Sequence, residues 1–457
     1  MKLKILGLIV LLAGLLISLN LGTKISRLFS EATGKKATIV VEADKEIGPM
    51  PRMWNNFSQG GESHDGMLTA AIKPMQTLSP NYVRIDHIYD FYDVVKNENG
   101  RLKFNWTKLD REVEAILKMG AKPFLALSYM PPALGSDITG KPDNWDQWQE
   151  VVRATIEHYS GKQNKNIDKV YYEVWNEPDL FGNWKAWGDK NYLDLYRQSA
   201  RAADNAVNVQ SFKLGGPATT GMYRNWIEAM FKMVNEEGLR FDFVSWHRYS
   251  LNPEQFKKDV EELSRLLAVY PRLALKEKVV SEWGLDSENN PGYDDNLGAA
   301  HTVAGVIEMI GAVAKAFSFE IKDGLNPENK TFWGRFGMIS HEDTGLVLKP
   351  RYQAFKWLND LGETRLYLSG EGSFVKATAA RKNKDVQVYL VNYDKSGRHQ
   401  ETVPVIIKNL LPGNYEMIRE SFDGTKESAL VKITNGTWVG QVIMPANEIV
   451  RLTLKPR

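Results

Sequence analysis

The feature that most constrains the fold is a repeated change between short apolar strands and amphipathic helices across residues 53–361. Residues 107–119 are one such helix, because Leu109, Val113 and Ile116 fall on the same face. Strands that alternate with helices form a parallel sheet in an α/β fold, and eight of them predict a closed (β/α)8 TIM barrel. The predicted strands are residues 53–57, 82–85, 123–127, 170–175, 212–214, 243–246, 279–281 and 316–319.

An open, doubly wound sheet is the alternative arrangement for this pattern. That fold usually binds a nucleotide through a glycine-rich turn after its first strand. No such turn follows residues 53–57, and the number of strands fits a closed barrel better. Basic and acidic residues are nearly balanced, at 58 and 56, so nothing points to a nucleic-acid partner. The absence of cysteine excludes disulfides, thiolate metal sites and a cysteine nucleophile.

The sequence changes character after the barrel region. With 457 residues the chain exceeds the roughly 250 to 300 residues that one core supports, so we expect two domains. Residues 37–361 are the predicted catalytic barrel. Helical periodicity ends there, and strand patterns broken by turn sequences predict an antiparallel β-sandwich over residues 362–457. Residues 37–50 contain a short β-branched strand that could pair with this sandwich instead of opening the barrel.

The N-terminus predicts export. Residues 1–25 are interpreted as a signal or membrane anchor, and residues 26–36 as a polar linker. Lys2 and Lys4 precede an almost wholly apolar stretch over residues 5–21, and roughly 17 apolar residues reach the lower limit for crossing a bilayer. No convincing small-residue cleavage site follows. We therefore expect the protein to face the periplasm or the exterior and to be anchored in the membrane, with a cleaved signal as the alternative.

Two carboxylates stand at the polar ends of predicted barrel strands. Glu177 follows residues 170–175 and precedes Pro178, which lacks an amide donor and ends the strand. Glu282 follows residues 279–281 in the same way. Barrel enzymes keep their catalytic residues at the carboxyl ends of the strands, and two carboxylates about 5 Å apart can flank one glycosidic bond. Either residue alone would more often be an ordinary exposed glutamate.

The motifs around these carboxylates resemble those of a known enzyme clan. Trp-Asn-Glu-Pro at 175–178 and Ser-Glu-Trp-Gly at 281–284 resemble the retaining (β/α)8 glycoside hydrolases with catalytic Glu on strands four and seven. Three further segments, Leu-Ala-Leu-Ser-Tyr-Met-Pro at 125–131, Leu-Gly-Gly-Pro-Ala at 214–218 and Ser-Trp-His-Arg-Tyr at 245–249, are similar to glycoside hydrolase family 39. That family includes β-xylosidases, α-L-iduronidases and endoglycosidases that cut bacterial exopolysaccharides. The resemblance covers residues 53–361 and, through the sandwich that follows, extends to the rest of the chain.

This resemblance implies roles for individual residues. Glu177 matches the general acid/base, and Glu282 matches the nucleophile. The residues that hold the nucleophile or the bound sugar in the family match Asn176, Arg84, His247 and Tyr249. An amide such as Asn176 can donate to and accept from a sugar hydroxyl without titrating. A lone histidine on a strand would otherwise more often be a core residue.

The segment of strand eight departs from the family pattern. Many relatives carry a tryptophan there as a platform for the sugar, whereas Phe319 and Glu320 occupy this place. Tryptophans on other loops could replace it, although a tryptophan in such a place is at least as often a packing residue. The candidates are Trp54, Trp184, Trp187 and Trp333.

The sequence and the resemblance together predict a retaining glycoside hydrolase without a metal or organic cofactor. We expect a monomer that acts on a β-linked polysaccharide or oligosaccharide, and aromatic residues on separate loops favour internal cleavage of an exopolysaccharide. Two alternatives remain open. One is an exo-acting β-xylosidase-like enzyme, and the other is a non-catalytic polysaccharide-binding or assembly protein. The presence of Asn176 and both carboxylates argues against a loss of catalysis.

Overall fold

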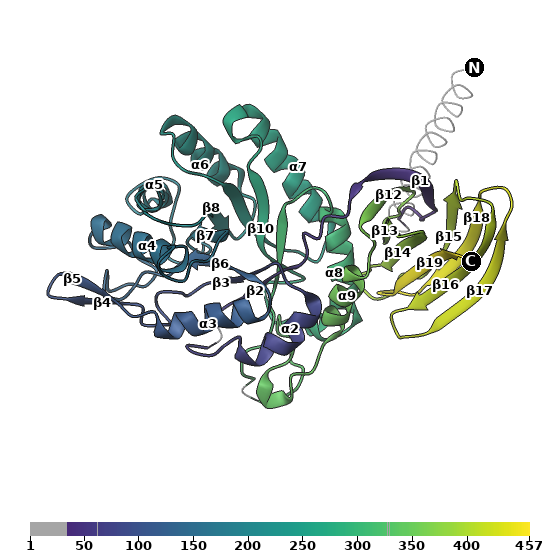
Figure 1. Cartoon of the computed structure of the whole chain (residues 1–457), viewed down its shortest axis with the longest axis horizontal. Coiled ribbons are helices and arrows are strands. Elements are labelled where there is room, and N and C mark those ends of the chain that lie inside the picture. The colour runs from purple at the N-terminus through teal and green to yellow at the C-terminus, as the bar shows by residue number, and fades with distance from the viewer. Residues whose placement is uncertain (1–33, 62, 327, 329) are drawn as a thin grey trace, which may run out of the picture. The chain divides into compact units, whose positions relative to one another are not determined.

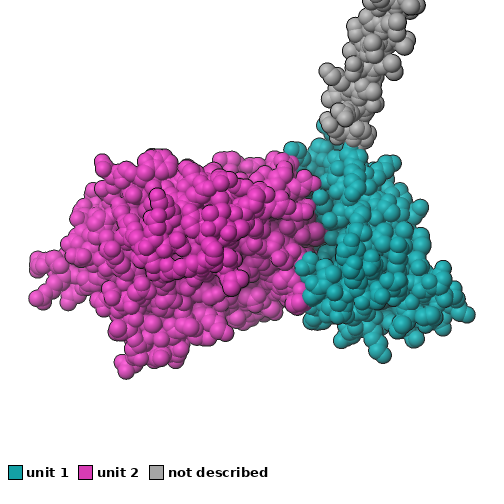
Figure 2. All heavy atoms as spheres, turned by 90° about the horizontal axis from the view of Figure 1, so that it is seen from above, with its two compact units in different colours: residues 1–48, 362–457 teal, residues 49–361 magenta. Residues whose placement is uncertain are grey.

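The computed structural model describes residues 34–61, 63–326, 328 and 330–457. These residues form two compact units, one of residues 49–361 and one that combines the chain up to residue 48 with residues 362–457 (Figures 1 and 2). The predicted anchor and signal, residues 1–25, lies outside the described residues. Within the described part of the chain, no helix has the length and apolar character needed to cross a membrane.

Eight parallel strands close into a barrel in the larger unit, and they follow one another around the barrel in sequence order. Each of the eight predicted strands is present, so the prediction of a TIM barrel is confirmed (Figure 1). The strands are β2 (Asn56–Gln59), β3 (Tyr82–Ile85), β6 (Lys122–Leu127), β7 (Val170–Val174), β8 (Phe212–Thr219), β9 (Phe243–Tyr249), β10 (Glu277–Gly284) and β11 (Lys315–Phe319).

Helices follow the barrel strands and surround them (Figure 1). They are α2 (Ile72–Leu78), α3 (Thr107–Lys118), α4 (Trp145–Tyr159), α5 (Tyr192–Asp204), α6 (Arg224–Glu236), α7 (Glu254–Val269), α8 (Asn296–Met309) and α9 (Pro350–Asn359). Several of these helices begin after a residue whose side chain caps the first turn. Asn144 accepts from the amide of Asp146 and Asn191 from that of Leu193, which satisfies amides at the starts of α4 and α5.

Shorter elements complete the larger unit. A hairpin of β4 (Val95–Glu98) and β5 (Arg101–Phe104) lies between β3 and α3 in the sequence. Single 3-10 turns are η1 (Thr69–Ala71), η2 (Pro271–Leu273), η3 (Pro291–Asp294) and η4 (Glu342–Thr344).

Inside the barrel, five strands each contribute one buried side chain to a cluster, so the interior is packed and not an open pore. Its members are Phe124, Tyr171, Phe243, Val279 and Phe317.

The second unit is a sheet of nine strands, mostly antiparallel, in the order β17-β16-β19-β14-β13-β12-β1-β15-β18. Side chains from the strands at both ends of this order, Ile433 and Val442, belong to one buried cluster, so the sheet curls around a common core as a β-sandwich does. The strands are β1 (Ile39–Pro49), β12 (Thr364–Ser369), β13 (Val375–Lys382), β14 (Asp385–Asn392), β15 (Glu401–Lys408), β16 (Gly413–Ser421), β17 (Lys426–Ile433), β18 (Trp438–Met444) and β19 (Ile449–Pro456).

β1 joins this C-terminal sheet although it is the first strand of the chain. Ile39 to Glu42 pair in parallel with Val405 to Lys408 of β15. Residues 39–48 therefore belong to this unit, in the pairing that the sequence left open for residues 37–50. The pairing spans more than 360 positions of the sequence, which a local pattern cannot specify uniquely.

The packed interior of the barrel predicts a stability effect. The ring of Phe124 lies 4.7 Å from that of Phe317 and 5.5 Å from that of Phe243, measured between centroids. We expect Phe124→Ala to lower the free energy of unfolding by about 3–5 kcal/mol, because it leaves a cavity that the closed barrel cannot collapse. Urea denaturation measures this. The control Val207→Ala, at a side chain 69% exposed, should change it by less than about 0.5 kcal/mol. Equal effects of the two variants would contradict the packing described.

Candidate active site

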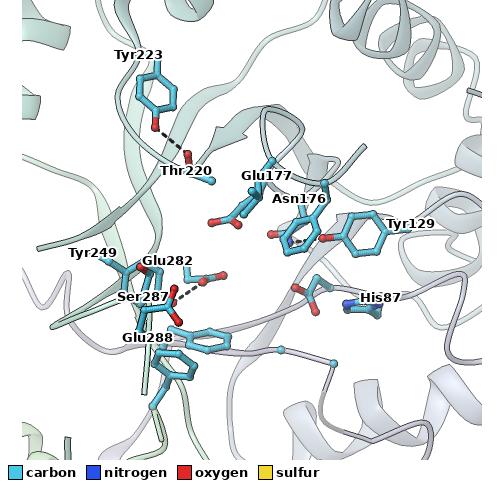
Figure 3. Close-up of a pocket in the computed structure, with 17 residues that line it drawn as sticks. His87, Tyr129, Asn176, Glu177, Thr220, Tyr223, Tyr249, Glu282, Ser287 and Glu288 are labelled. Carbon is cyan, nitrogen blue, oxygen red and sulfur yellow. Dashed lines mark hydrogen bonds between the residues drawn. The ribbon is translucent and has the colours of Figure 1, made fainter. Parts of the chain in front are cut away.

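A cavity of about 620 Å³ opens at the carboxyl ends of the barrel strands (Figure 3). Asn176 and Glu177 follow β7, while Tyr249 and Glu282 lie near the ends of β9 and β10. Phe319, the last residue of β11, also lines the cavity. The cavity therefore lies where barrel enzymes keep their catalytic residues.

Glu177 and Glu282 come close together in this cavity. One carboxylate oxygen of each residue and one ring nitrogen of His247 all lie within 4.8 Å of one another. His247 Nδ1 is 2.9 Å from Glu177 Oε1 and 3.7 Å from Glu282 Oε2. Strand register explains the arrangement, because His247 on β9 is the pairing partner of Glu282 on β10. The carboxylates thus have the short separation of a nucleophile and an acid that act on one bond.

Arg84 connects Glu282 to Glu173 and Asn176 through its guanidinium group. Its Nη1 lies 3.2 Å from Glu282 Oε2, and its Nε donates to Glu173 Oε2 at 2.8 Å. Its Nη2 donates to Asn176 Oδ1 at 2.7 Å, and Asn176 Nδ2 in turn donates to the hydroxyl of Tyr129 at 2.8 Å. The side chains of Arg84 and Glu173 are both fully buried. One guanidinium group therefore fixes the positions of two carboxylates and an amide.

The protonation of Glu282 is set by opposing influences. Burial raises the pKa of Glu282 above its ordinary value, and the charge of Glu177 raises it further. The charges of His247 and Arg84 act in the opposite direction. Tyr249 also lowers it, because its hydroxyl donates to Glu282 Oε1 at 2.5 Å. Arg84 and Tyr249 thus place two donors on Glu282, which favours the ionised carboxylate.

His247 brings a third titratable group into the cavity. Burial alone would lower the pKa of His247, but the charge of Glu282 and the hydrogen bond to Glu177 raise it above its usual value. Protons in such a closely spaced group belong to the whole set of residues, not to one of them. The cluster therefore places a titratable imidazole within hydrogen-bond distance of one carboxylate and close to the other.

The same three residues could offer ligands to a divalent cation. Two carboxylate oxygens and an imidazole nitrogen within 4.8 Å have suitable chemistry and spacing. The guanidinium of Arg84, 3.2 Å from Glu282, already supplies a fixed positive charge at this place. That charge repels a cation and favours an acid and base function of the cluster over metal binding.

The backbone that carries Glu177 is unusual. Trp175 has a φ of 73° and Glu177 a φ of 45°, both in the left-handed region that residues with a side chain rarely adopt. The amide of Glu177 donates to the carbonyl of Ala218 at 3.0 Å, which ties this turn to the carboxyl end of β8. Such backbone conformations concentrate at functional sites, where the surrounding structure holds them in place.

The predicted tryptophan contacts are not in this cavity. Trp54 precedes β2, at the opposite end of the barrel strands, and its indole donates to Asn359 Oδ1 at 2.9 Å. Trp184 is fully buried and donates to the carbonyl of Thr139 at 3.1 Å. Trp333 lines a separate cavity of about 450 Å³. Trp54 and Trp184 therefore have the positions of packing residues, the alternative that the sequence left open, while contact of Trp333 with a sugar stays a prediction.

Other aromatic residues form the walls of the cavity. Phe319 is one of the two residues at which strand eight departs from the family pattern. It lines the cavity together with Phe336, and their ring centroids are 5.3 Å apart. Phe181 and Tyr223, each about two-fifths exposed, line it as well. Glu320 does not line it, because its carboxylate is fully buried and accepts from Gln59 Nε2 at 2.8 Å.

The sequence reasoning missed three polar residues of the site. Tyr129 contacts Asn176, Glu173 holds Arg84, and Asp86 lines the cavity. Glu173 had a signal, because it interrupts the apolar strand 170–174 with a charge that must be paired when buried. The sequence also contained a signal for Asp86, since this residue stands two positions after Arg84 and therefore on the same side of the chain as that residue.

Comparison with known proteins identifies the family. The model of glycosyl hydrolases family 39 matches residues 38–409. The chain belongs to this family. The prediction of a family 39 glycoside hydrolase is thereby confirmed.

Two relatives and two solved structures show how far the likeness extends. A β-xylosidase of Geobacillus stearothermophilus is 28% identical over 313 residues, and one of Caldicellulosiruptor saccharolyticus is 25% identical over 356. The chain covers 60% and 69% of the lengths of these relatives. A monomeric β-xylosidase from Caulobacter crescentus CB15 has a TM-score of 0.76 at 21% identity, covering 92% of this chain and 99% of its own. A family 39 enzyme from Xanthomonas axonopodis pv. citri also has 0.76, at 20% identity, covering 94% and 99%.

The buried Arg84–Glu173 pair predicts a stability effect of its own. We expect Glu173→Ala to lower the free energy of unfolding by about 3–5 kcal/mol, because it leaves the buried guanidinium with too little negative charge. Urea denaturation measures the change. The control Glu114→Ala removes a carboxylate that is 51% exposed and lies 3.4 Å from Lys165, and should cost about 1 kcal/mol or less. A loss at Glu173 no larger than at Glu114 would contradict the anchoring role.

Proposed function

We propose that the protein is a retaining glycoside hydrolase in which Glu177 is the general acid/base and Glu282 the nucleophile. The observation that carries the proposal is that carboxylate oxygens of these residues lie within 4.8 Å of each other. Retaining glycosidases hold their carboxyl groups about 5–5.5 Å apart, whereas inverting enzymes need about 6.5–9.5 Å to admit a water. The two donors on Glu282, from Arg84 and Tyr249, suit the residue that must be ionised.

The reaction takes two steps. In the first, a carboxylate oxygen of Glu282 attacks the anomeric carbon while Glu177 gives its proton to the glycosidic oxygen. The bond to the leaving group breaks, and a covalent glycosyl-enzyme forms. In the second, Glu177 takes a proton from a water that attacks the same carbon and releases Glu282. Asn176, held by Arg84 and Tyr129, is placed to bind the 2-hydroxyl, a contact that strengthens in the transition state.

As substrate we propose a β-linked xyloside, from which the enzyme releases terminal sugars. Two relatives that align with this chain are named β-xylosidases, which supports this choice over the internal cleavage expected from the sequence. The aromatic walls of the cavity, among them Phe319 and Phe336, are suited to the apolar faces of a sugar ring. A chain-end enzyme also needs no aromatic contacts beyond the cavity, which agrees with the positions of Trp54, Trp184 and Trp333.

Internal cleavage of a polysaccharide is the second candidate. Leu180 and Phe181, at the rim beside Glu177, are 57% and 41% exposed. Trp187, a few residues further along the same segment, is also exposed. Exposed apolar side chains next to the acid/base would extend contact to further sugars of a chain.

The roles of the two carboxylates predict the effects of isosteric substitution. Glu177→Gln and Glu282→Gln should each lower kcat on a β-linked substrate by at least about 100-fold, because neither amide can transfer the proton or attack the carbon. Steady-state kinetics measure this, with thermal unfolding as the check on folding. On an aryl glycoside whose leaving group needs no proton, Glu177→Gln should recover much of the bond-breaking step and Glu282→Gln should not.

The matched control for these variants is Glu114→Gln, on α3 and largely exposed, which should keep wild-type kinetics. If either catalytic variant kept more than about a tenth of wild-type kcat, the role of that residue would be wrong. A wild-type protein without turnover on any β-linked substrate would instead support a binding or assembly protein.

Tyr249 predicts a change in the pH profile. Its hydrogen bond lowers the pKa of Glu282, so Tyr249→Phe should raise that pKa. Glu282 must be ionised to attack, and activity is therefore lost as the pH falls through its folded-state pKa. The acidic limb of kcat/KM should move to higher pH in Tyr249→Phe, measured against Tyr270→Phe, which changes a tyrosine at the end of α7. An unchanged limb, or one at lower pH, would argue against the nucleophile assignment.

The mode of cleavage can be measured on a soluble β-xylan. Release of terminal sugars should lower the viscosity only slowly for each reducing end that forms, and the first product should be the monosaccharide. Viscometry with chromatography of early products provides both readings. A steep fall in viscosity with oligosaccharides as first products would favour internal cleavage and the second candidate.

A further inference from the structure

Asp86 is a carboxyl group on the cavity wall that the two-step reaction leaves unused. It directly follows β3, two positions beyond Arg84, and lines the same cavity as Glu177 and Glu282. The residue is only 6% exposed. Its Oδ1 accepts no hydrogen bond from any residue that the structure describes. Asp86 is thus built into the wall with a free acceptor.

An acceptor in this position requires an explanation. Buried polar groups in folded proteins nearly always have a hydrogen-bond partner, and a buried carboxylate without one is unfavourable. Burial raises the pKa of Asp86 above its usual value, although the nearby charges of His87 and Arg84 oppose this. No hydrogen bond from the described chain to Oδ1 holds the fold together, so this oxygen is available to accept from a hydroxyl group of a ligand in the cavity.

The surroundings of Asp86 indicate which part of the substrate it meets. Figure 3 shows His87, Tyr129 and Asn176 on one side of the cavity, and Thr220 with Tyr223 on the other side of Glu177. The rings of His87 and Tyr129 are 4.7 Å apart, and Tyr129 accepts from Asn176. Because Asn176 is placed to bind the 2-hydroxyl, this wall faces the glycon, the sugar that is transferred to Glu282.

The charges around the cavity limit which glycon can bind. The titratable acids that line it are Asp86, Glu177, Glu282 and Glu288, and no lysine or arginine is among the described lining residues. Arg84 is fully buried behind the wall, where Glu173 and Glu282 already contact it. Among the described lining residues the one basic side chain is His87, whose Nδ1 already lies 2.8 Å from Asp90 Oδ2. A sugar carboxylate would therefore meet mainly negative charge, whereas sugar hydroxyls could donate to Asp86.

We propose that Asp86 determines specificity in the glycon subsite by accepting hydrogen bonds from hydroxyls of a neutral sugar and disfavouring a sugar that carries a carboxylate. The proposal rests on the proposed function. Asn176 is placed to take the 2-hydroxyl, so the hydroxyls that reach Asp86 are those farther around the ring, at positions 3 and 4. The ligand class is thus a neutral pentose or hexose with free hydroxyls at these positions.

Deoxy sugars test the contact directly. We would measure kcat/KM of the wild type, Asp86→Asn and Asp86→Ala on an aryl β-xyloside, on its 3-deoxy and 4-deoxy analogues, and on an aryl β-glucuronide. Loss of a hydrogen bond to a charged acceptor should lower the wild-type value by about 10- to 100-fold for at least one deoxy analogue. In Asp86→Ala the same analogue should be used about as well as the parent xyloside. The ratio of glucuronide to xyloside turnover should rise in Asp86→Asn.

The controls separate this inference from general damage and from failure of the proposed function. Asp168→Asn, at a half-exposed carboxylate before β7, should keep the wild-type ratios. If Asp86→Ala lost the same factor on parent and deoxy substrates, or lost nothing, the specificity role would be overturned while the glycosidase function remained. A wild type that preferred the glucuronide would also overturn it. Absence of turnover on every glycoside would overturn the proposed function, and this inference with it.

Discussion

The site depends on one buried cation, the guanidinium of Arg84. Its partners Glu173 and Glu282 stand 89 and 198 positions further along the chain, and only a closed barrel brings β3, β7 and β10 to the same interior. A buried charge is tolerated when paired and hydrogen-bonded, and Arg84 has donors on two carboxylates and on Asn176. The fold and the site therefore support each other: the barrel places the partners, and the partners make the buried charge acceptable.

The same network prepares the chemistry. Burial and the charge of Glu177 raise the pKa of Glu282, and the charge of Arg84 and the hydrogen bond from Tyr249 act in the opposite direction. His247, within hydrogen-bond distance of Glu177, adds a group whose pKa is raised by the carboxylates. In the mechanism proposed here, these opposed influences let two similar side chains take different protonation states at one place, as acid and nucleophile must.

Much of this architecture could be predicted from the sequence because it follows from local patterns. The barrel strands are short apolar runs that end in polar residues, and parallel strands bring their carboxyl ends together. These two facts predict that Glu177 and Glu282 lie at the same end of the barrel. The membership of β1 was not fixed in this way, because it depends on pairing with the distant β15. The positions of aromatic side chains on loops could not be predicted from local patterns either. Trp184 has the chemistry of a sugar platform, but its exposure is decided by packing with segments such as that of Thr139.

The most direct test of the central claim is to trap the covalent intermediate. An aryl 2-deoxy-2-fluoro-β-xyloside slows both steps of a retaining reaction, and the slower release leaves the sugar on the nucleophile. After proteolysis, mass spectrometry should find one fluoroxylosyl group, and fragmentation should place it on Glu282. An adduct on Glu177, or none on an enzyme that hydrolyses the ordinary xyloside, would contradict the assignment of Glu282 as the nucleophile of a double displacement.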